Sequence, residues 1–198
     1  MRCPALTEYE VRSATSWAQQ GWQCMVPERL RQTTRRFVPD MDWFGGAELA
    51  LDPDLACEHP LLIRALELWR DARGARRMPA RRDVDPTTLP RDLIGNILLI
   101  DVEHEPVRRF RWRLIGTEVT RRMGRDSTGR YWDELYDAKT LDWFAKGPEW
   151  VLTHRRPLRL AGKVPVESRD FMRSESIDLP LSDDGENVTM IWVVSTFS

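Results

Sequence analysis

The chain has 198 residues, of which 41% are hydrophobic and 31% are charged. That is enough for one packed domain with an extension or for two small domains, and it excludes a wholly disordered chain and a disulfide-stapled miniprotein. The 30 lysines and arginines almost balance the 31 acidic residues, for a formal net charge of −1. The total charge therefore gives no reason to expect a nucleic-acid or membrane partner, which would have to be argued from a local patch.

The cysteines indicate a reducing compartment. Cys3, Cys24 and Cys57 are odd in number and widely spaced, and they form neither a CxxC pair nor a set with metal-ligand spacing. The sequence shows no signal peptide and no apolar run near the ~20 residues that a membrane span needs. We expect a cytoplasmic protein with no membrane association.

The pattern of apolar residues changes at about Cys57. In residues 1–57 the apolar positions fit neither the helical nor the strand period, which favours a poorly ordered N-terminal arm. Met41 offers an alternative start for the chain. After the arm we expect a flanking helix with a linker rich in proline and arginine at 58–95, followed by a core domain at 96–198.

The first predicted helix runs from about Pro60 to Ala72. Pro60 suits a first helical position, and Gly74 is placed to end the helix. We expect its apolar stripe to be partly uncovered in a monomer and to carry a homodimer interface together with the outer face of the sheet. The residues of the stripe are Leu62, Ala65, Leu66 and Trp69.

After this helix and linker, the spacing of apolar residues changes from the helical period to the two-residue period of strands. Residues 96–102 form a short continuous apolar run, and residues 109–114 alternate strictly between apolar and arginine. The alternation predicts that Phe110, Trp112 and Leu114 share one face. Such a strand is typical of an antiparallel sheet with one buried face.

Short helices and three further strands complete the predicted order. Gly147-Pro148 is expected to interrupt the helical stretch near 141–153. The sequence therefore predicts an α+β fold, an antiparallel sheet of about five strands with short helices on one face, preceded by an amphipathic helix. The other predicted segments are helical at 118–123 and 131–137 and extended at 158–164, 171–181 and 188–197.

Local motifs follow this order along the chain. They are LWRDARGARRMPARRDVDP, ILLIDV, FRWRLIGTEV, GRDSTGR and LPLSDDG. With these motifs the chain resembles the PAS superfamily, and more narrowly a PAS-like family of small, stand-alone bacterial proteins. The resemblance covers about Pro60 to Ser198 and implies the PAS fold.

The resemblance implies sensing or protein interaction rather than catalysis. PAS domains hold a small molecule between sheet and helices, or they dimerise through the outer sheet face and a flanking helix. Flavin chemistry of the LOV type needs a cysteine beside the flavin, and all three cysteines precede the PAS-like region. His154 lies near the place of the ligand in haem-binding PAS domains and is a weak candidate for that role; otherwise we expect no cofactor and no metal.

Inward-facing residues of the predicted sheet and helices are candidates to line a ligand pocket. A collapsed hydrophobic core explains the same residues without a ligand. The candidates are Trp112, Leu114, Met123, Trp143, Phe144, Val151, Leu160, Ile177, Met190 and Trp192.

Arginines gather in two clusters that fit a phosphate-bearing ligand or an acidic partner. Pairing with nearby acids on a solvated face explains them without a ligand, and nucleic-acid binding is not expected. Arg111 and Arg113, with the helix residues Leu62, Leu66 and Trp69, are the candidate interface residues. The clusters are Arg111, Arg113, Arg121, Arg122, Arg125 and Arg130, and Arg73, Arg76, Arg77, Arg81 and Arg82.

No catalytic motif such as GxSxG, HExxH or a Walker loop is present, so we expect no enzymatic activity. The sequence predicts a non-catalytic sensory or signalling domain that acts through contacts with itself and with an unidentified signalling protein. A domain gated by a small ligand, or by haem or another cofactor, is the alternative within the same family.

Overall fold

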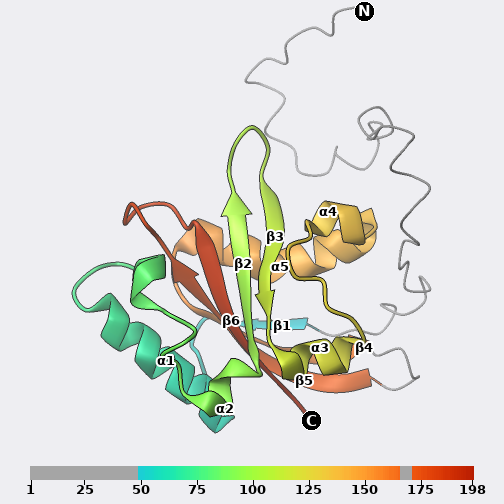
Figure 1. The fold of residues 1–198 in the computed structure, drawn as a ribbon, viewed down its shortest axis with the longest axis horizontal. Coiled ribbons are helices and arrows are strands. Elements are labelled where there is room, and N and C mark those ends of the chain that lie inside the picture. Colours follow the sequence, from blue (N-terminus) through green and yellow to red (C-terminus); the bar gives the residue numbers. More distant parts are fainter. Residues whose placement is uncertain (1–48, 166–170) are drawn as a thin grey trace, which may run out of the picture. The chain divides into compact units, whose positions relative to one another are not determined.

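An antiparallel sheet of six strands, in the order β1-β4-β5-β6-β2-β3, lies at the centre of the folded domain (Figure 1). The computed structural model describes residues 49–165 and 171–198. The alternative start at Met41 falls outside these residues. The strands are β1 (Leu49–Asp52), β2 (Ile97–Glu103), β3 (Arg109–Ile115), β4 (Leu158–Pro165), β5 (Phe171–Leu181) and β6 (Met190–Phe197).

The sheet has one strand more than predicted. The last five strands lie within two residues of the predicted bounds, and they confirm the α+β architecture. The added strand, β1, pairs with β4, with Leu49 opposite Gly162 and Asp52 opposite Arg159. The folded domain therefore begins inside the segment 1–57 that composition assigned to the arm.

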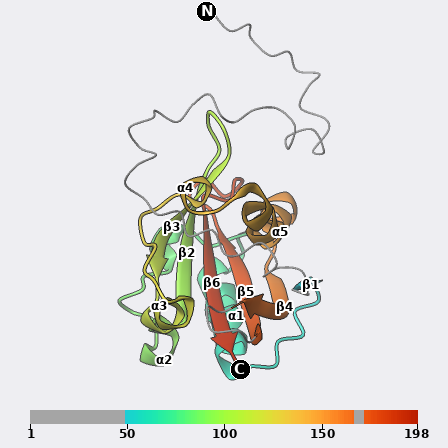
Figure 2. The same ribbon diagram turned by 90° about the vertical axis from the view of Figure 1, so that its right-hand side faces the viewer.

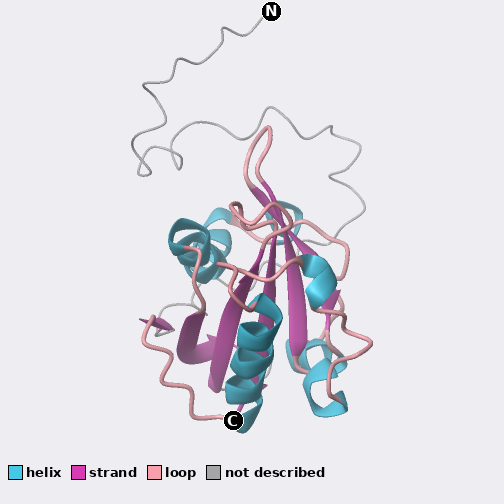
Figure 3. Ribbon diagram, turned by 90° about the vertical axis from the view of Figure 1, so that its left-hand side faces the viewer, coloured by secondary structure: helices cyan, strands magenta, loops and turns pink. Residues whose placement is uncertain are grey.

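Helices cover both faces of the sheet. They are α1 (Pro60–Arg73), α2 (Arg91–Ile94), α3 (Thr117–Met123), α4 (Trp132–Leu135) and α5 (Ala138–His154). The first two lie on one side and the other three on the opposite side (Figures 1 and 2). In Figure 3, seen from the first side, α1 lies in front of the strands.

α1 is amphipathic as predicted, but its apolar stripe packs inside the molecule. Leu62 and Ala65 are fully buried, and Leu66 and Trp69 nearly so. The indole Nε1 of Trp69 donates to the Pro180 carbonyl oxygen of β5 at 2.8 Å. The prediction of a partly uncovered stripe is wrong because the outer face of the sheet covers it. The interface candidates Leu62, Leu66 and Trp69 are core residues.

α5 is continuous, so the predicted interruption at Gly147-Pro148 is wrong. The helix begins at Asp137, whose carboxylate accepts from the Thr140 N–H at 2.8 Å. Pro148 removes one backbone hydrogen bond, but it is buried with Gly147 where α5 packs on the sheet, and this packing offsets the local cost. Arg155, in the left-handed conformation with φ 53°, ends the helix.

A β-bulge redirects one side chain that was predicted to face the pocket. Ile100 pairs with Trp112 while the preceding Leu99 pairs with Leu114, so Arg113 is the extra residue of β3. Leu114 therefore lies on the face opposite Trp112. The prediction that the two residues share a face is wrong.

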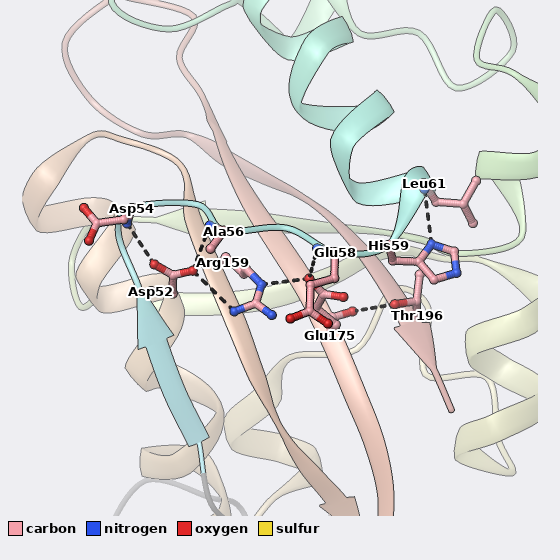
Figure 4. A network of polar contacts seen from close by, with 9 residues as sticks. All are labelled: Asp52, Asp54, Ala56, Glu58, His59, Leu61, Arg159, Glu175 and Thr196. Carbon is pink, nitrogen blue, oxygen red and sulfur yellow. Dashed lines mark hydrogen bonds and ion pairs between the residues drawn. The ribbon is translucent and has the colours of Figure 1, made fainter.

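A partly buried ion-pair network fastens the segment before α1 to the sheet (Figure 4). Arg159 Nε lies 2.7 Å from Glu175 Oε1, and its Nη1 lies 3.3 Å from Asp52 Oδ2. The backbone N–H of Glu58 donates to Glu175, and that of Ala56 to Asp52. Burial opposes ionisation of both carboxyls, but these hydrogen bonds and Arg159 outweigh it and hold the pKa of each below its usual value.

Candidate functional site

A mostly apolar cavity of about 150 Å³ lies between the sheet and helices α3 and α5. Residues of all six strands form its floor, and residues of α3, α5 and the segment around α4 form its walls. A cavity of this volume accommodates a molecule about the size of benzene. It is therefore large enough for a small ligand.

The cavity brings together half of the residues predicted to line a pocket. These are Trp112, Met123, Trp143, Phe144 and Leu160. The other half do not line it. Val151 is a fully buried core residue of α5. The remaining four lie on the side of the sheet that faces α1, and they are Leu114, Ile177, Met190 and Trp192. Alternation assigned the wrong face because helices cover both sides of the sheet, so that both sets of strand positions are apolar.

Aromatic side chains form one wall of the cavity. The ring centroids of Trp112 and Trp132 are 4.7 Å apart, and Tyr136 stacks on Phe144 at 4.9 Å. The indole Nε1 of Trp112 donates to the Tyr136 hydroxyl at 3.2 Å. Burial raises the pKa of that hydroxyl, which stays neutral at physiological pH. These contacts fix the rings against one another, so the wall is preformed.

Asp178 is a candidate functional residue that sequence reasoning missed. β5 places it opposite Leu158 of β4 and Val193 of β6, and it is only 3% exposed. Burial raises the pKa of its carboxyl to about 7. No described residue donates a hydrogen bond to this carboxyl or forms an ion pair with it. The available signal was an acidic residue inside the apolar segment 177–181.

Gly147 lets α5 approach this carboxyl closely. A Cβ at this position would lie 2.7 Å from Leu160 Cδ1 and 2.9 Å from Asp178 Oδ2. Only glycine therefore leaves this end of the cavity open without a shift of its neighbours.

A few other polar groups reach the cavity. The Ser127 and Ser195 side chains are buried beside it. Trp132 Nε1–H is buried and has no acceptor among the described residues. Arg125 also lines the cavity, with its guanidinium 5.8 Å from the centre of the Tyr136 ring. An apolar cavity with a small number of polar groups is the usual form of a small-molecule site.

His154 does not reach this cavity. Its exposed ring stacks on Trp150 with centroids 4.0 Å apart, and its Nδ1–H donates to the Trp150 carbonyl at 2.8 Å. It is not placed to ligate a haem in the cavity. Across residues 49–165 and 171–198, no three or more His, Cys, Asp or Glu side chains are grouped to hold a metal ion.

The first arginine cluster is largely paired with acids. Arg111 Nη2 lies 2.7 Å from Asp101 Oδ2, and Arg113 Nη1 lies 3.8 Å from the same oxygen. Downstream, Arg121 Nη2 lies 2.6 Å from Glu118 Oε1, and hydrogen bonds from arginines lower the pKa of Glu118 to about 2. As interface candidates, Arg111 and Arg113 present a charge that Asp101 partly neutralises.

The second cluster contributes to a groove of about 360 Å³ beside the C-terminal ends of α1 and α5. No carboxylate of the described residues pairs with any arginine in this groove. The Nε of Arg73 is buried without an acceptor there. The arginines that line the groove are Arg70, Arg73, Arg77, Arg155 and Arg156.

Comparison with known proteins agrees with the fold. The sequence profile of the PAS domain family matches residues 57–194. The chain belongs to the PAS domain family, whose members are sensory and signalling domains that are generally not catalytic. No curated protein and no solved structure matches the chain. Within the part of the chain that the structure describes, no helix is long and apolar enough to cross a membrane.

Proposed function

We propose that this PAS domain is a cytoplasmic, non-catalytic sensor that binds a small ligand between its sheet and helices α3 and α5. The observation that carries the proposal is the unpaired carboxyl of Asp178 on the wall of a mostly apolar cavity. The output of the sensor is contact with a signalling protein. Homodimerisation through the α1 stripe is not part of the proposal, because that stripe is buried.

An empty cavity containing such a group is energetically costly. Atoms that line an unfilled apolar space lack packing partners on that side, which is unfavourable. An unpartnered buried polar group adds a further cost of about 1–3 kcal/mol. A ligand that fills the space and hydrogen-bonds to Asp178 relieves both, which favours a bound state. The competing occupant is water held by Asp178, Ser127 and Ser195.

Native mass spectrometry of freshly purified full-length protein tests the proposal. We expect an additional small mass that is released on denaturation. For a ligand lost during purification, we expect thermal unfolding to shift upward with at least one member of a panel of benzene-sized compounds, since binding to the folded state stabilises it. A protein with no retained mass and no response to the panel would contradict a ligand-binding role.

The arginine groove supports a second candidate function, the binding of a phosphate-bearing small molecule. Arginine recognises phosphate through bidentate hydrogen bonds, and the groove arginines lack carboxylate partners among the described residues. Their position at two helix ends also has a structural explanation, because cations offset the partial negative charge of helix C-termini.

Calorimetric titration with pyrophosphate separates these two roles of the groove. A phosphate site predicts saturable binding that weakens steeply with salt and is lost when Arg70 and Arg156 are replaced by alanine. The matched control is Arg108→Ala, which removes an exposed arginine paired with Glu149. Equal binding by the control and the groove variant, or no binding, would leave only the structural role.

A further inference from the structure

Asp178 differs from three partly buried carboxylates of the sheet region in having no counter-charge. Asp101, Glu175 and Asp52 each have an arginine nitrogen within 2.7 to 3.3 Å. The chain is rich in arginine, yet no described arginine pairs with Asp178, and burial alone accounts for its raised pKa. These three carboxylates each have an arginine partner, whereas Asp178, which faces the cavity, has none among the described residues.

The cavity has the features expected of a cation site. An ionised carboxylate only accepts hydrogen bonds, whereas a protonated amine is positively charged and only donates. Aromatic rings attract cations over their faces, and Trp112, Trp132 and Phe144 line the same cavity. A protonated amine with an apolar body is complementary to both the carboxylate and the aromatic wall.

We propose that the ligand is a small organic cation, a protonated amine about the size of benzylamine, whose ammonium group donates to the Asp178 carboxylate. Its apolar part fills the aromatic end of the cavity. The inference rests on the proposed function and names the class of ligand for that site.

The surroundings of Asp178 hold no second group that titrates near neutral pH. α5 presents Gly147 to it, β4 presents Leu160, and β6 presents Val193 and Ser195. Arginine stays charged, and burial raises the pKa of tyrosine further above neutrality. The other titratable groups among the described cavity residues are Arg125 and Tyr136.

A proton on Asp178 competes with the amine for the carboxylate. With the pKa of Asp178 at about 7, the affinity for a permanently protonated amine falls about 30-fold between pH 8 and pH 5.5. A neutral ligand of the same shape does not show this loss. The pH profile of the wild-type protein is therefore a test that needs no variant.

Calorimetric titrations of the full chain with benzylamine and with benzyl alcohol test the inference. These probes have nearly the same shape and differ in charge. At pH 8 we expect benzylamine to bind at least tenfold more tightly than benzyl alcohol to the wild type, and the difference to vanish in Asp178→Asn. The control Asp142→Asn removes an exposed carboxylate of α5 and should bind like the wild type.

The outcomes separate the ligand class from the site. If both probes bind equally at pH 8, if D178N keeps the preference for the amine, or if the affinity of the wild type for the amine does not fall between pH 8 and pH 5.5, the cation inference is wrong while the cavity remains a ligand site. If neither probe gives saturable binding to the wild type at either pH, the inference is overturned, and the proposed function is then decided by the broader panel and the retained mass.

Discussion

Asp178 makes the stability of the ligand-free protein depend on pH. Burial raises its pKa from 3.8 to about 7, so the folded state holds a proton that the unfolded chain releases above about pH 4. Its contribution to stability is most favourable below that pH, falls as the pH rises toward 7, and levels off above. A shift of about three pKa units corresponds to roughly 4 kcal/mol between these limits.

The substitution Asp178→Asn removes this dependence. At pH 8 we expect the free energy of unfolding of the ligand-free variant to exceed that of the wild type by about 1–3 kcal/mol, because the amide buries no charge. At pH 5 the two should differ by less than about 1 kcal/mol. Urea denaturation at both pH values measures the difference. A difference that is independent of pH would mean that Asp178 does not titrate in this range.

The substitution Gly147→Ala should close the acidic end of the cavity. The new methyl group meets the ends of the Leu160 and Asp178 side chains, which must move, while alanine gains up to about 1 kcal/mol of helix propensity. We expect stability to change by less than about 1 kcal/mol and benzylamine affinity to fall at least tenfold. Lys146→Ala, on the exposed face of α5, is the control. An unchanged affinity would place the amine elsewhere.

At the scale of elements, α1 is held to the sheet by one buried hydrogen bond and its apolar stripe. Trp69→Phe keeps most of the packing but leaves the Pro180 carbonyl without its donor. We expect a loss of about 1–3 kcal/mol in the free energy of unfolding. Ile63→Ala, on the exposed side of the same helix, should cost no more than about 0.5 kcal/mol. Equal effects in urea denaturation would mean that α1 does not dock as described.

The Arg159 network makes a separate contribution at the start of α1. Arg159→Met leaves Asp52 and Glu175 partly buried without their shared cation, and we expect a loss of about 3 kcal/mol at pH 7. Because both carboxyls lose the arginine that stabilises their charge, the deficit should shrink below pH 5. The exposed pair of Arg108 and Glu149 provides the control, since Arg108→Met should cost about 1 kcal/mol or less. A deficit that does not change with pH would argue against the ion pairs.

Periodicity was sufficient to locate elements with a strong pattern of their own. α1, β2 and β3 were predicted because each carries a continuous apolar run, a strict alternation or a 3.6-residue stripe, and the turn at 182–185 separated β5 from β6. β1 has only four residues, and its partner β4 lies far along the chain, so no local pattern identified it. Pro148 led to a wrong prediction of a helix break, because the cost of its lost backbone hydrogen bond is offset by packing on the sheet that the sequence does not display.

The site could be predicted only in part, because which face of a strand lines the cavity depends on tertiary packing. Trp112 and Phe144 were assigned to the cavity because large aromatic residues at inward positions are a strong signal. Trp192 was misplaced because both faces of β6 are apolar. Asp178 was missed because acidic residues are expected in solvent, and only the observed register shows that this one faces inward.

At the scale of the whole molecule, the sheet separates the cavity from α1 and also connects them. Asp178 faces the cavity from β5, and two residues further along the same strand the Pro180 carbonyl accepts from Trp69 of α1. β5 therefore has a contact on each side of the sheet, with the cavity and with α1.

The central claim is that the cavity beside Asp178 binds a small organic cation. A titration of isotope-labelled full-length protein with benzylamine at pH 8, followed by amide and indole N–H resonances, tests it most directly. The account predicts saturable shifts concentrated at Gly147, Asp178, Ser195 and the Trp132 indole N–H, which lie around the cavity. Saturable shifts located elsewhere, or none at these four positions, would contradict it.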